Sequence, residues 1–339
     1  MSITDPQLIC THPFSWFEIH RHGDVFLCCP AWLKRPIGNL LQTPVADIWN
    51  SPVAQEIRKT IHNRSFHNCS KVRCPFLADS LSPVQPLVAV TEQRIKRALE
   101  TRAAHLDFPP TRLNLCFDHS CNLACPSCRP ARQVATGSAR DKARRISEII
   151  CAELLPRAEE VTMSGYGDPF ASPAYLAILR QLNASSGEIP QLRLHSNGQL
   201  WTRQRWEQLP RLHDRVKEAE ISVDAASAAT YAVNRPGGSF EILLNNLAYL
   251  AEQPFPLTLS MVLQQNNFQE IPLLIELATR LKARVYLSRL VNWGTFAKAE
   301  FTRRAVHLPT HPEHQQLVTL LREYRHRPQI NLGNLLPLL

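Results

Sequence analysis

The 339-residue sequence lacks any apolar run long enough to cross a bilayer. Its first ten residues, MSITDPQLIC, also lack the basic and apolar regions of a secretory signal peptide. We therefore expect a cytoplasmic protein with no membrane partner. In that reducing compartment, the ten cysteines are expected to be metal ligands or catalytic thiols rather than structural disulfides.

A long run of basic residues is also missing, although the formal net charge is +9. The lysines and arginines are scattered, and their densest group lies at 129–145. This distribution favours a solvated basic surface. The alternative is an acidic partner such as nucleic acid, a phosphorylated metabolite or an acidic peptide.

No cysteine follows Cys151, and the sequence contains no internal repeat or low-complexity tract. Five cysteines fall between residues 10 and 74, and five between 116 and 151. A polar helical stretch, TEQRIKRALETRAAH, separates the two groups and is typical of a connector. We expect a cysteine-rich domain at 1–85, a helical connector at 86–110, a main domain at 111–295 and a C-terminal helical tail at 296–339.

From residue 111 onward the sequence alternates between strand and helix patterns. Ser172 and Ser239 are typical helix N-caps within this region. Six βα units in series predict parallel strands with right-handed crossovers. The expected fold is α/β, a partial (β/α)6 TIM-like barrel with functional groups at the carboxyl ends of its strands, preceded by a small α+β domain. The predicted strands are RLNLCF, EVTMSG, QLRLHSNG, EAEISVDA, LTLSMVLQ and ARVYLSRLV.

Directly after the first of these strands comes CNLACPSC, which contains Cys121, Cys125 and Cys128 without a fourth cysteine nearby. A structural zinc site takes four ligands and a disulfide takes two. Three thiolates can hold three irons of a [4Fe–4S] cube and leave the fourth iron open. The alternatives are an accidental cluster or a zinc site that borrows a distant histidine.

This motif resembles C-x3-C-x2-C of the radical S-adenosylmethionine (SAM) enzymes, which lies on the loop after the first barrel strand. The resemblance covers about residues 111–295 and implies a [4Fe–4S] cluster on Cys121, Cys125 and Cys128. In that family SAM chelates the open iron, an electron cleaves SAM, and the 5′-deoxyadenosyl radical abstracts hydrogen from a substrate. It also implies an oxygen-sensitive oxidoreductase and an electron donor such as flavodoxin or ferredoxin.

Other strand ends resemble the SAM contacts of the family. The segment SGYGDP is similar to the glycine-rich segment that meets the methionine amino group, with Asp168 where Glu is common, and the NWG segment after the last strand could border the adenine. The alternative for each residue is an ordinary strand-end turn. Arg235 is a further candidate for reaching a carboxylate in the pocket. The implied cofactor-binding residues are Gly165, Tyr166, Gly167, Asp168, Asn197, Ser222, Asp224 and Gln264.

The N-terminal region resembles the SPASM-type auxiliary-cluster domain in GDVFLCCP, IGNL and DIWNS. That domain usually follows the barrel, whereas here it precedes it. The resemblance implies a second [4Fe–4S] cluster on Cys10, Cys28, Cys69 and Cys74, with Cys29 as the alternative to Cys28. A structural zinc site on the same four thiols is the other possibility.

The motifs and the family resemblance suggest three alternative functions. The first is a radical SAM enzyme that oxidises, cross-links or epimerises a peptide or protein, because relatives with the auxiliary domain mostly act on peptides. The second is a radical dehydrogenase or related enzyme for a sugar, an aminocyclitol or a nucleotide-linked sugar. The third is a zinc-dependent module that binds nucleic acid. The third predicts a concentration of basic and aromatic residues that the sequence lacks, so no nucleic-acid partner is expected.

Overall fold

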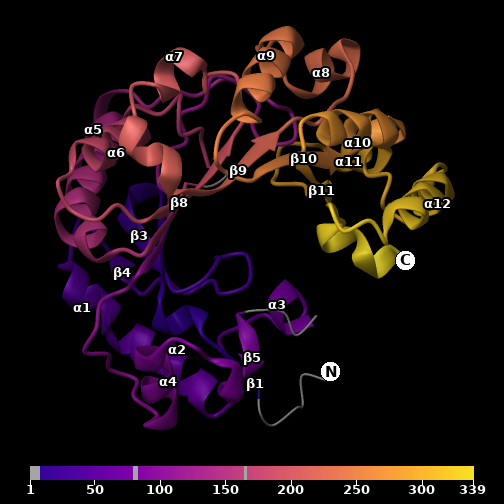
Figure 1. Ribbon diagram of the computed structural model, residues 1–339. Coiled ribbons are helices and arrows are strands. Elements are labelled where there is room, and N and C mark those ends of the chain that lie inside the picture. The colour runs from indigo at the N-terminus through magenta and orange to yellow at the C-terminus, as the bar shows by residue number, and fades with distance from the viewer. Residues whose placement is uncertain (1–7, 79–82, 164–165) are drawn as a thin grey trace. The chain divides into compact units, whose positions relative to one another are not determined.

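The computed structural model describes residues 8–78, 83–163 and 166–339 (Figure 1). The chain forms two compact units, each assembled from more than one segment. The first unit contains Met1–Asp118, Thr136–Met163 and Ser185–Gln191. The second contains His119–Ala135, Ser164–Ala184 and Leu192–Leu339.

The first unit contains a mixed set of strands around β2 (Trp16–His20). Strand β2 pairs antiparallel with β3 (Asp24–Phe26), which continues to β4 (Gly38–Asn39). On its other side, β2 pairs parallel with β6 (Arg112–Cys116), and β6 pairs parallel with β7 (Glu160–Met163). A separate antiparallel pair joins β1 (Leu8–Cys10) to β5 (Val84–Pro86).

Helix α2 (Pro52–His62) is fixed within the first unit by one buried arginine. Ser51 caps the helix, since its hydroxyl accepts from Ala54 N at 3.2 Å. Arg58 is fully buried, and its guanidinium donates to carbonyl oxygens of three separate segments. The helices of this unit are α1 (Val45–Trp49), α2 (Pro52–His62), α3 (Pro75–Ala78), α4 (Gln93–Glu100) and α5 (Gly137–Ile149), with a π-helical segment (Ile150–Leu154) and short 3-10 turns η1 (His12–Phe14), η2 (Arg21–Gly23), η3 (Leu87–Ala89) and η5 (Leu155–Arg157).

The second unit contains a run of parallel strands. Strand β9 (Val216–Ser222) pairs with β8 (Gln191–Ser196) and β10 (Leu257–Leu263), and β10 pairs with β11 (Arg284–Arg289). The short β12 (Ile330–Asn331) extends this run beside β11. The helices are α6 (Pro173–Ala184), α7 (Arg203–Trp206), α8 (Ala228–Asn234), α9 (Phe240–Leu250), α10 (Ile271–Arg280), α11 (Lys298–Arg304) and α12 (His314–Tyr324), with 3-10 turns η6 (Pro210–Arg215), η7 (Phe268–Glu270) and η8 (Gly333–Leu338).

The structure confirms the α/β class, with mostly parallel strands and a small N-terminal cysteine-containing part. All six predicted strands are present, as β6 to β11. Ser172 and Ser239 cap α6 and α9, accepting from Tyr175 N at 3.1 Å and Ile242 N at 3.3 Å. Within 296–339, expected to be helical, β12 adds a strand. Among the described residues, no helix combines the length and apolarity that a bilayer span requires.

Candidate functional site

The second unit contains a polar cavity of about 390 Å³ at the carboxyl ends of its parallel strands. Most of the sequence-predicted site residues of this region line it. Tyr166 and Gln264 do not, and Gly165 lies outside the described residues. The predicted residues that line the cavity are Cys121, Cys125, Cys128, Gly167, Asp168, Asn197, Ser222 and Asp224.

The cysteine loop is held in place by backbone hydrogen bonds within the second unit. Cys121 N donates to Gln133 O at 2.8 Å, and Cys128 N donates to Cys125 O at 2.9 Å. Cys121 and Cys125 are buried, whereas Cys128 is exposed. The loop therefore places two sheltered thiols and one accessible thiol along the same cavity wall.

Each of the three thiols accepts a hydrogen bond from a side-chain N–H group. Hydrogen bonds to sulfur are one of the ways in which proteins tune iron–sulfur clusters. Two of the three donors are guanidinium groups, which favour thiolate over neutral thiol. The contacts are Asn197 Nδ2 to Cys121 Sγ at 3.6 Å, Arg235 Nη1 to Cys125 Sγ at 3.5 Å and Arg129 Nη2 to Cys128 Sγ at 3.4 Å.

Burial opposes these donors at Cys121 and Cys125, because it favours the neutral thiol over the thiolate. It raises the pKa of Cys121, and the nearby Asp168 carboxylate raises it further. Burial also raises the pKa of Cys125, although Arg235 partly offsets this increase. Without a cation these two thiols favour the protonated form, while a bound metal centre would hold them as thiolates.

Asp168 uses its carboxylate to join two loops. Oδ2 accepts from Ser196 Oγ and from Asn197 N, both at 2.8 Å, and Oδ1 accepts from Phe170 N at 2.9 Å. Preceding it, Gly167 has φ +86°, a conformation that favours glycine. Asp168 therefore positions Asn197, the residue that donates to the Cys121 thiol.

Asp224 adopts a strained conformation beside the cavity, with φ +55°. Its carboxylate accepts from Val262 N at 2.7 Å and forms a 2.8 Å ion pair with Arg235 Nη2. Its carbonyl accepts from Asn234 Nδ2 and Asn267 Nδ2. These contacts stabilise the strained residue and aim the Arg235 guanidinium at the cysteine loop. The carboxylate that Arg235 reaches in this cavity is therefore that of Asp224.

Three other residues predicted to contact SAM, namely Ser222, Gln264 and Tyr166, interact with different parts of the second unit. Ser222 Oγ lies 2.7 Å from His195 Nε2, on the neighbouring strand β8. Gln264 is buried, and its side-chain oxygen accepts from Arg304 at 3.3 Å. Tyr166 is 40% exposed, and its ring lies tilted against that of His119, with the centroids 4.9 Å apart. Only Ser222 of these three has its side chain at the cavity.

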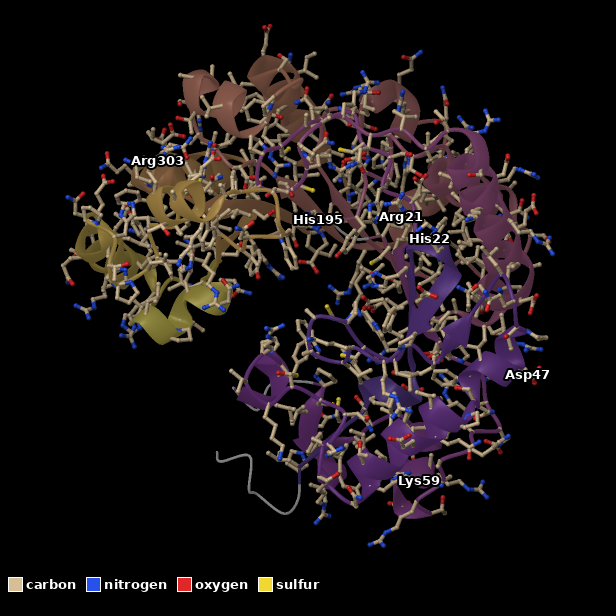
Figure 2. All side chains as sticks on the ribbon, turned by 180° about the vertical axis from the view of Figure 1, so that it is seen from behind. Arg21, His22, Asp47, Lys59, His195 and Arg303 are labelled. Carbon is tan, nitrogen blue, oxygen red and sulfur yellow. The ribbon has the colours of Figure 1, made fainter. Side chains whose placement is uncertain are left out.

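Several cavity residues are missing from the sequence-predicted set. His195, labelled in Figure 2, lies on β8 within 3.4 Å of Glu220. Arg129 follows the third cysteine directly, a position that could have suggested its contact with Cys128. Trp293, from the NWG segment considered in the sequence analysis, also lines the cavity and is 64% exposed.

The four predicted auxiliary cysteines lie in the first unit, close enough for their charges to interact. Cys10 interacts with Cys69 and Cys74, and Cys28 interacts with Cys10 and Cys74. Burial raises the pKa of all four thiols, that of Cys69 to about 11. These thiols therefore also suit a metal centre that keeps them ionised.

Cys28 and Cys29 differ in their surroundings. Cys28 Sγ accepts from Trp32 Nε1 at 3.1 Å and lies 3.5 Å from His12 Nδ1. Burial, together with the charges of Glu18 and Cys74, raises the pKa of Cys29 to about 11. These contacts favour Cys28 as the ligand.

The spacing of the thiols can be compared with that of a single zinc site. A tetrahedral zinc ion with 2.3 Å bonds holds its sulfurs about 3.8 Å apart. Within the described part of the chain, no three cysteine sulfurs lie within 4.8 Å of one another. The cysteine sulfurs of the described residues therefore do not have the spacing of a single tetrahedral zinc ion.

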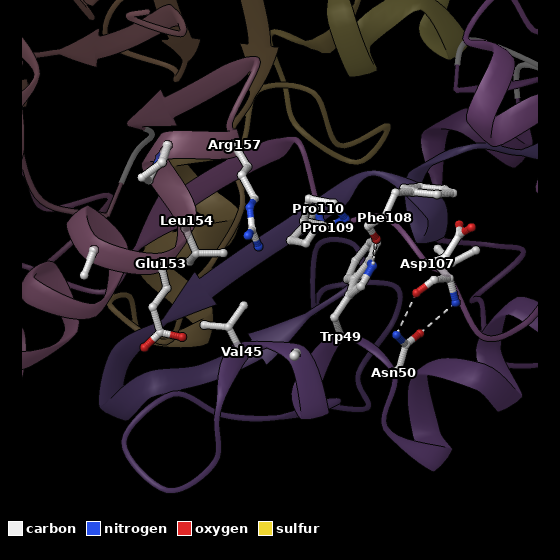
Figure 3. Close-up of a pocket in the computed structure, with 14 residues that line it drawn as sticks. Val45, Trp49, Asn50, Asp107, Phe108, Pro109, Pro110, Glu153, Leu154 and Arg157 are labelled. Carbon is white, nitrogen blue, oxygen red and sulfur yellow. Dashed lines mark hydrogen bonds between the residues drawn. The ribbon is translucent and has the colours of Figure 1, made fainter. Parts of the chain in front are cut away.

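A second cavity, of about 450 Å³, lies within the first unit and has a different chemical character (Figure 3). Its walls include Val45, Trp49, Phe108 and two prolines. Trp49 Nε1 already donates to Phe108 O at 2.8 Å. No cysteine or histidine is among the described residues that line this cavity, so these residues do not provide the thiols and imidazole of the polar cavity.

Comparison with protein families agrees with this geometry. Residues 117–278 match the model of the radical SAM superfamily. The chain contains a radical SAM domain. Residues 10–75 match SPASM, described as an iron-sulfur cluster-binding domain. The two matches imply a [4Fe–4S] cluster with SAM and an additional iron–sulfur cluster, and they confirm the N-terminal place of the SPASM domain.

No curated protein matches the chain. Among solved structures, SuiB of Streptococcus suis bound to S-adenosylmethionine is 14% identical with a TM-score of 0.45, covering 84% of this chain and 62% of that one. A further structure of SuiB is 12% identical with a TM-score of 0.47, covering 98% and 72%. A histidine-tagged form of anSMEcpe with bound AdoMet is 14% identical with a TM-score of 0.47, covering 63% and 57%. The chain thus spans less than two thirds of the first of these SuiB chains.

Proposed function

We propose that this radical SAM enzyme cleaves SAM reductively and abstracts hydrogen from a peptide or protein substrate. In this proposal Cys121, Cys125 and Cys128 hold a [4Fe–4S] cluster with one open iron. The observation that carries it is the donor set itself. Three thiols, each with an N–H donor, line one cavity, and no fourth cysteine is among its described lining residues.

Such a cluster, when bound, supplies an electron and an open iron for the amino and carboxylate groups of SAM, whose cleavage provides the 5′-deoxyadenosyl radical. The residues of the chain orient these groups. Gly167 permits close backbone approach, and Asp168 fixes Asn197 beside Cys121. Arg235 neutralises charge near Cys125 while remaining paired with Asp224.

Cys10, Cys28, Cys69 and Cys74 would hold the second cluster in the first unit. In relatives that carry this domain, the auxiliary cluster can accept an electron from the substrate radical during oxidation or cross-linking. The domain therefore supports an oxidising or cross-linking reaction on a peptide. A small-molecule electron source or a protein such as flavodoxin or ferredoxin would reduce the first cluster.

The first test replaces one ligand of the radical-generating cluster. Anaerobic wild-type protein is expected to contain about eight irons per chain, and Cys125→Ala about four, because only one of two clusters is disrupted. Cys125→Ala should also stop formation of 5′-deoxyadenosine under reduction. Cys151→Ala, outside both predicted ligand sets, is the matched control and should keep iron and activity.

The substrate class has its own test. Candidate peptides, and separately candidate sugars and aminocyclitols, are deuterated at one position and incubated with enzyme, SAM and reductant. Deuterium in 5′-deoxyadenosine from a peptide supports the proposal, whereas transfer from a sugar alone replaces it with the small-molecule reaction. Zinc without iron in anaerobic protein, and no spectral response to SAM, would contradict radical chemistry altogether.

A further inference from the structure

Strands β2 and β6 of the first unit bring three different metal-ligand types together. Glu18 and His20 are two residues apart on β2, so their side chains share one face. The parallel register sets His20 opposite Cys116 on β6. A carboxylate oxygen, an imidazole nitrogen and a thiol sulfur, one from each residue, all lie within 4.8 Å of one another.

These three groups are sheltered from solvent. Glu18 is 3% exposed and Cys116 is 2% exposed, and the His20 side chain is 14% exposed. A buried carboxylate is costly unless a charge or hydrogen bonds compensate it. Glu18 Oε1 lies 2.6 Å from His20 Nε2, and Oε2 accepts from Trp16 Nε1 at 3.0 Å. The tryptophan holds the carboxylate as outer-sphere groups do for metal-binding carboxylates.

We propose that Glu18, His20 and Cys116 bind a divalent cation of the zinc class. A cation would lie among the Glu18 carboxylate oxygen, the His20 ring nitrogen and the Cys116 sulfur. With an ionised Glu18, a thiolate at Cys116 and a neutral His20, a doubly charged ion makes the group neutral, and binding releases protons.

The donor types select the metal. A thiolate and an imidazole favour zinc or a similar borderline ion, and disfavour magnesium and calcium, which take oxygen ligands. Three protein ligands leave one tetrahedral position for water or a bound molecule. None of the three residues belongs to either predicted cluster, so this site is independent of the proposed SAM chemistry.

The experiment uses full-length protein whose iron–sulfur clusters have been reconstituted anaerobically. It is titrated with zinc chloride against a weak chelator, and zinc and iron are counted per chain. We expect about one zinc in addition to the iron. Zinc K-edge X-ray absorption should show one sulfur at about 2.3 Å, with the other ligands nitrogen or oxygen at about 2.0–2.2 Å.

The variants Cys116→Ser and Glu18→Gln should each weaken zinc binding at least about tenfold without loss of iron. Glu18→Gln preserves shape, so it keeps the test valid if the cysteine variant misfolds. Cys151→Ser is the matched control and should bind zinc like wild type. The proposal is overturned if no zinc binds, if bound zinc has three or four sulfur ligands, or if Glu18→Gln leaves its affinity unchanged.

Discussion

Arg235→Met separates two roles of the guanidinium beside Cys125. The arginine donates to Cys125 Sγ at 3.5 Å and pairs with Asp224 at 2.8 Å, and its side chain is only 11% exposed. Methionine has a similar length but no charge. The change therefore removes a donor from the sulfur and leaves a buried carboxylate without its partner.

Each loss has its own magnitude. A hydrogen bond from a charged group is worth about 1.5–3 kcal/mol. For a one-electron couple, this corresponds to about 60–130 mV, at 59 mV for each 1.4 kcal/mol. The cluster becomes more negative on reduction, so removal of the positive donor should lower its potential. The stranded Asp224 should separately lower the free energy of unfolding by about 3–5 kcal/mol.

The potential is measured by an EPR-monitored redox titration that follows the signal altered by SAM. Unfolding is measured in urea under anaerobic conditions. Arg205→Met is the matched control, because Arg205 donates to Phe170 O and does not line the cavity. Its potential should equal that of the wild type.

The double variant Asp224→Asn, Arg235→Met distinguishes the two roles. Neutral asparagine no longer needs the guanidinium, so stability should largely return, while the potential should stay below that of wild type. The opposite result would be an Arg235→Met variant that loses stability but keeps its potential within about 20 mV of wild type, a difference of roughly 0.5 kcal/mol. Arg235 would then have only a structural role.

Three further predictions concern other sites. Arg58→Met should lower the free energy of unfolding by about 3–5 kcal/mol, because three backbone carbonyls, two of them in buried contacts, lose their donor. The measurement is urea unfolding, and an equally large loss for Arg97→Met, at an exposed arginine, would refute this. Burial, with nearby positive groups, lowers the pKa of His307 to about 4. The free energy of unfolding should therefore be highest above about pH 6.5 and fall by about 3 kcal/mol as the pH approaches 4. Urea unfolding at each pH measures this decrease. His307→Phe should reduce the dependence on pH, and a variant with the wild-type dependence would contradict the prediction. Cys28→Ala should remove about four irons per chain, whereas Cys29→Ala should remove none. The reverse iron counts would identify Cys29, and not Cys28, as the ligand of the auxiliary cluster.

Local patterns in the sequence were enough to predict the main strands, two helix caps and the three-cysteine site of this protein. The alternation of strand and helix patterns after residue 111 predicts β6 to β11. Short apolar runs indicate buried strands and apolar residues at helical spacing indicate helices, and both patterns can be read from neighbouring residues. Ser172 and Ser239 likewise act on the backbone three residues ahead. The spacing of Cys121, Cys125 and Cys128 predicts a three-thiol site for the same reason, since one short loop carries all its ligands.

Which side chains surround those thiols depends on the tertiary structure. Arg235 lies 110 residues after Cys125 in the sequence, and Asn197 lies 76 residues after Cys121. Their contacts depend on strand register and on the paths of long loops, which no short sequence window encodes. The meeting of His20 with Cys116 has the same origin, because the parallel pairing of β2 with β6 joins residues from distant segments. The residue types of a short motif thus indicate the candidate ligands, whereas long-range packing determines which side chains contact them.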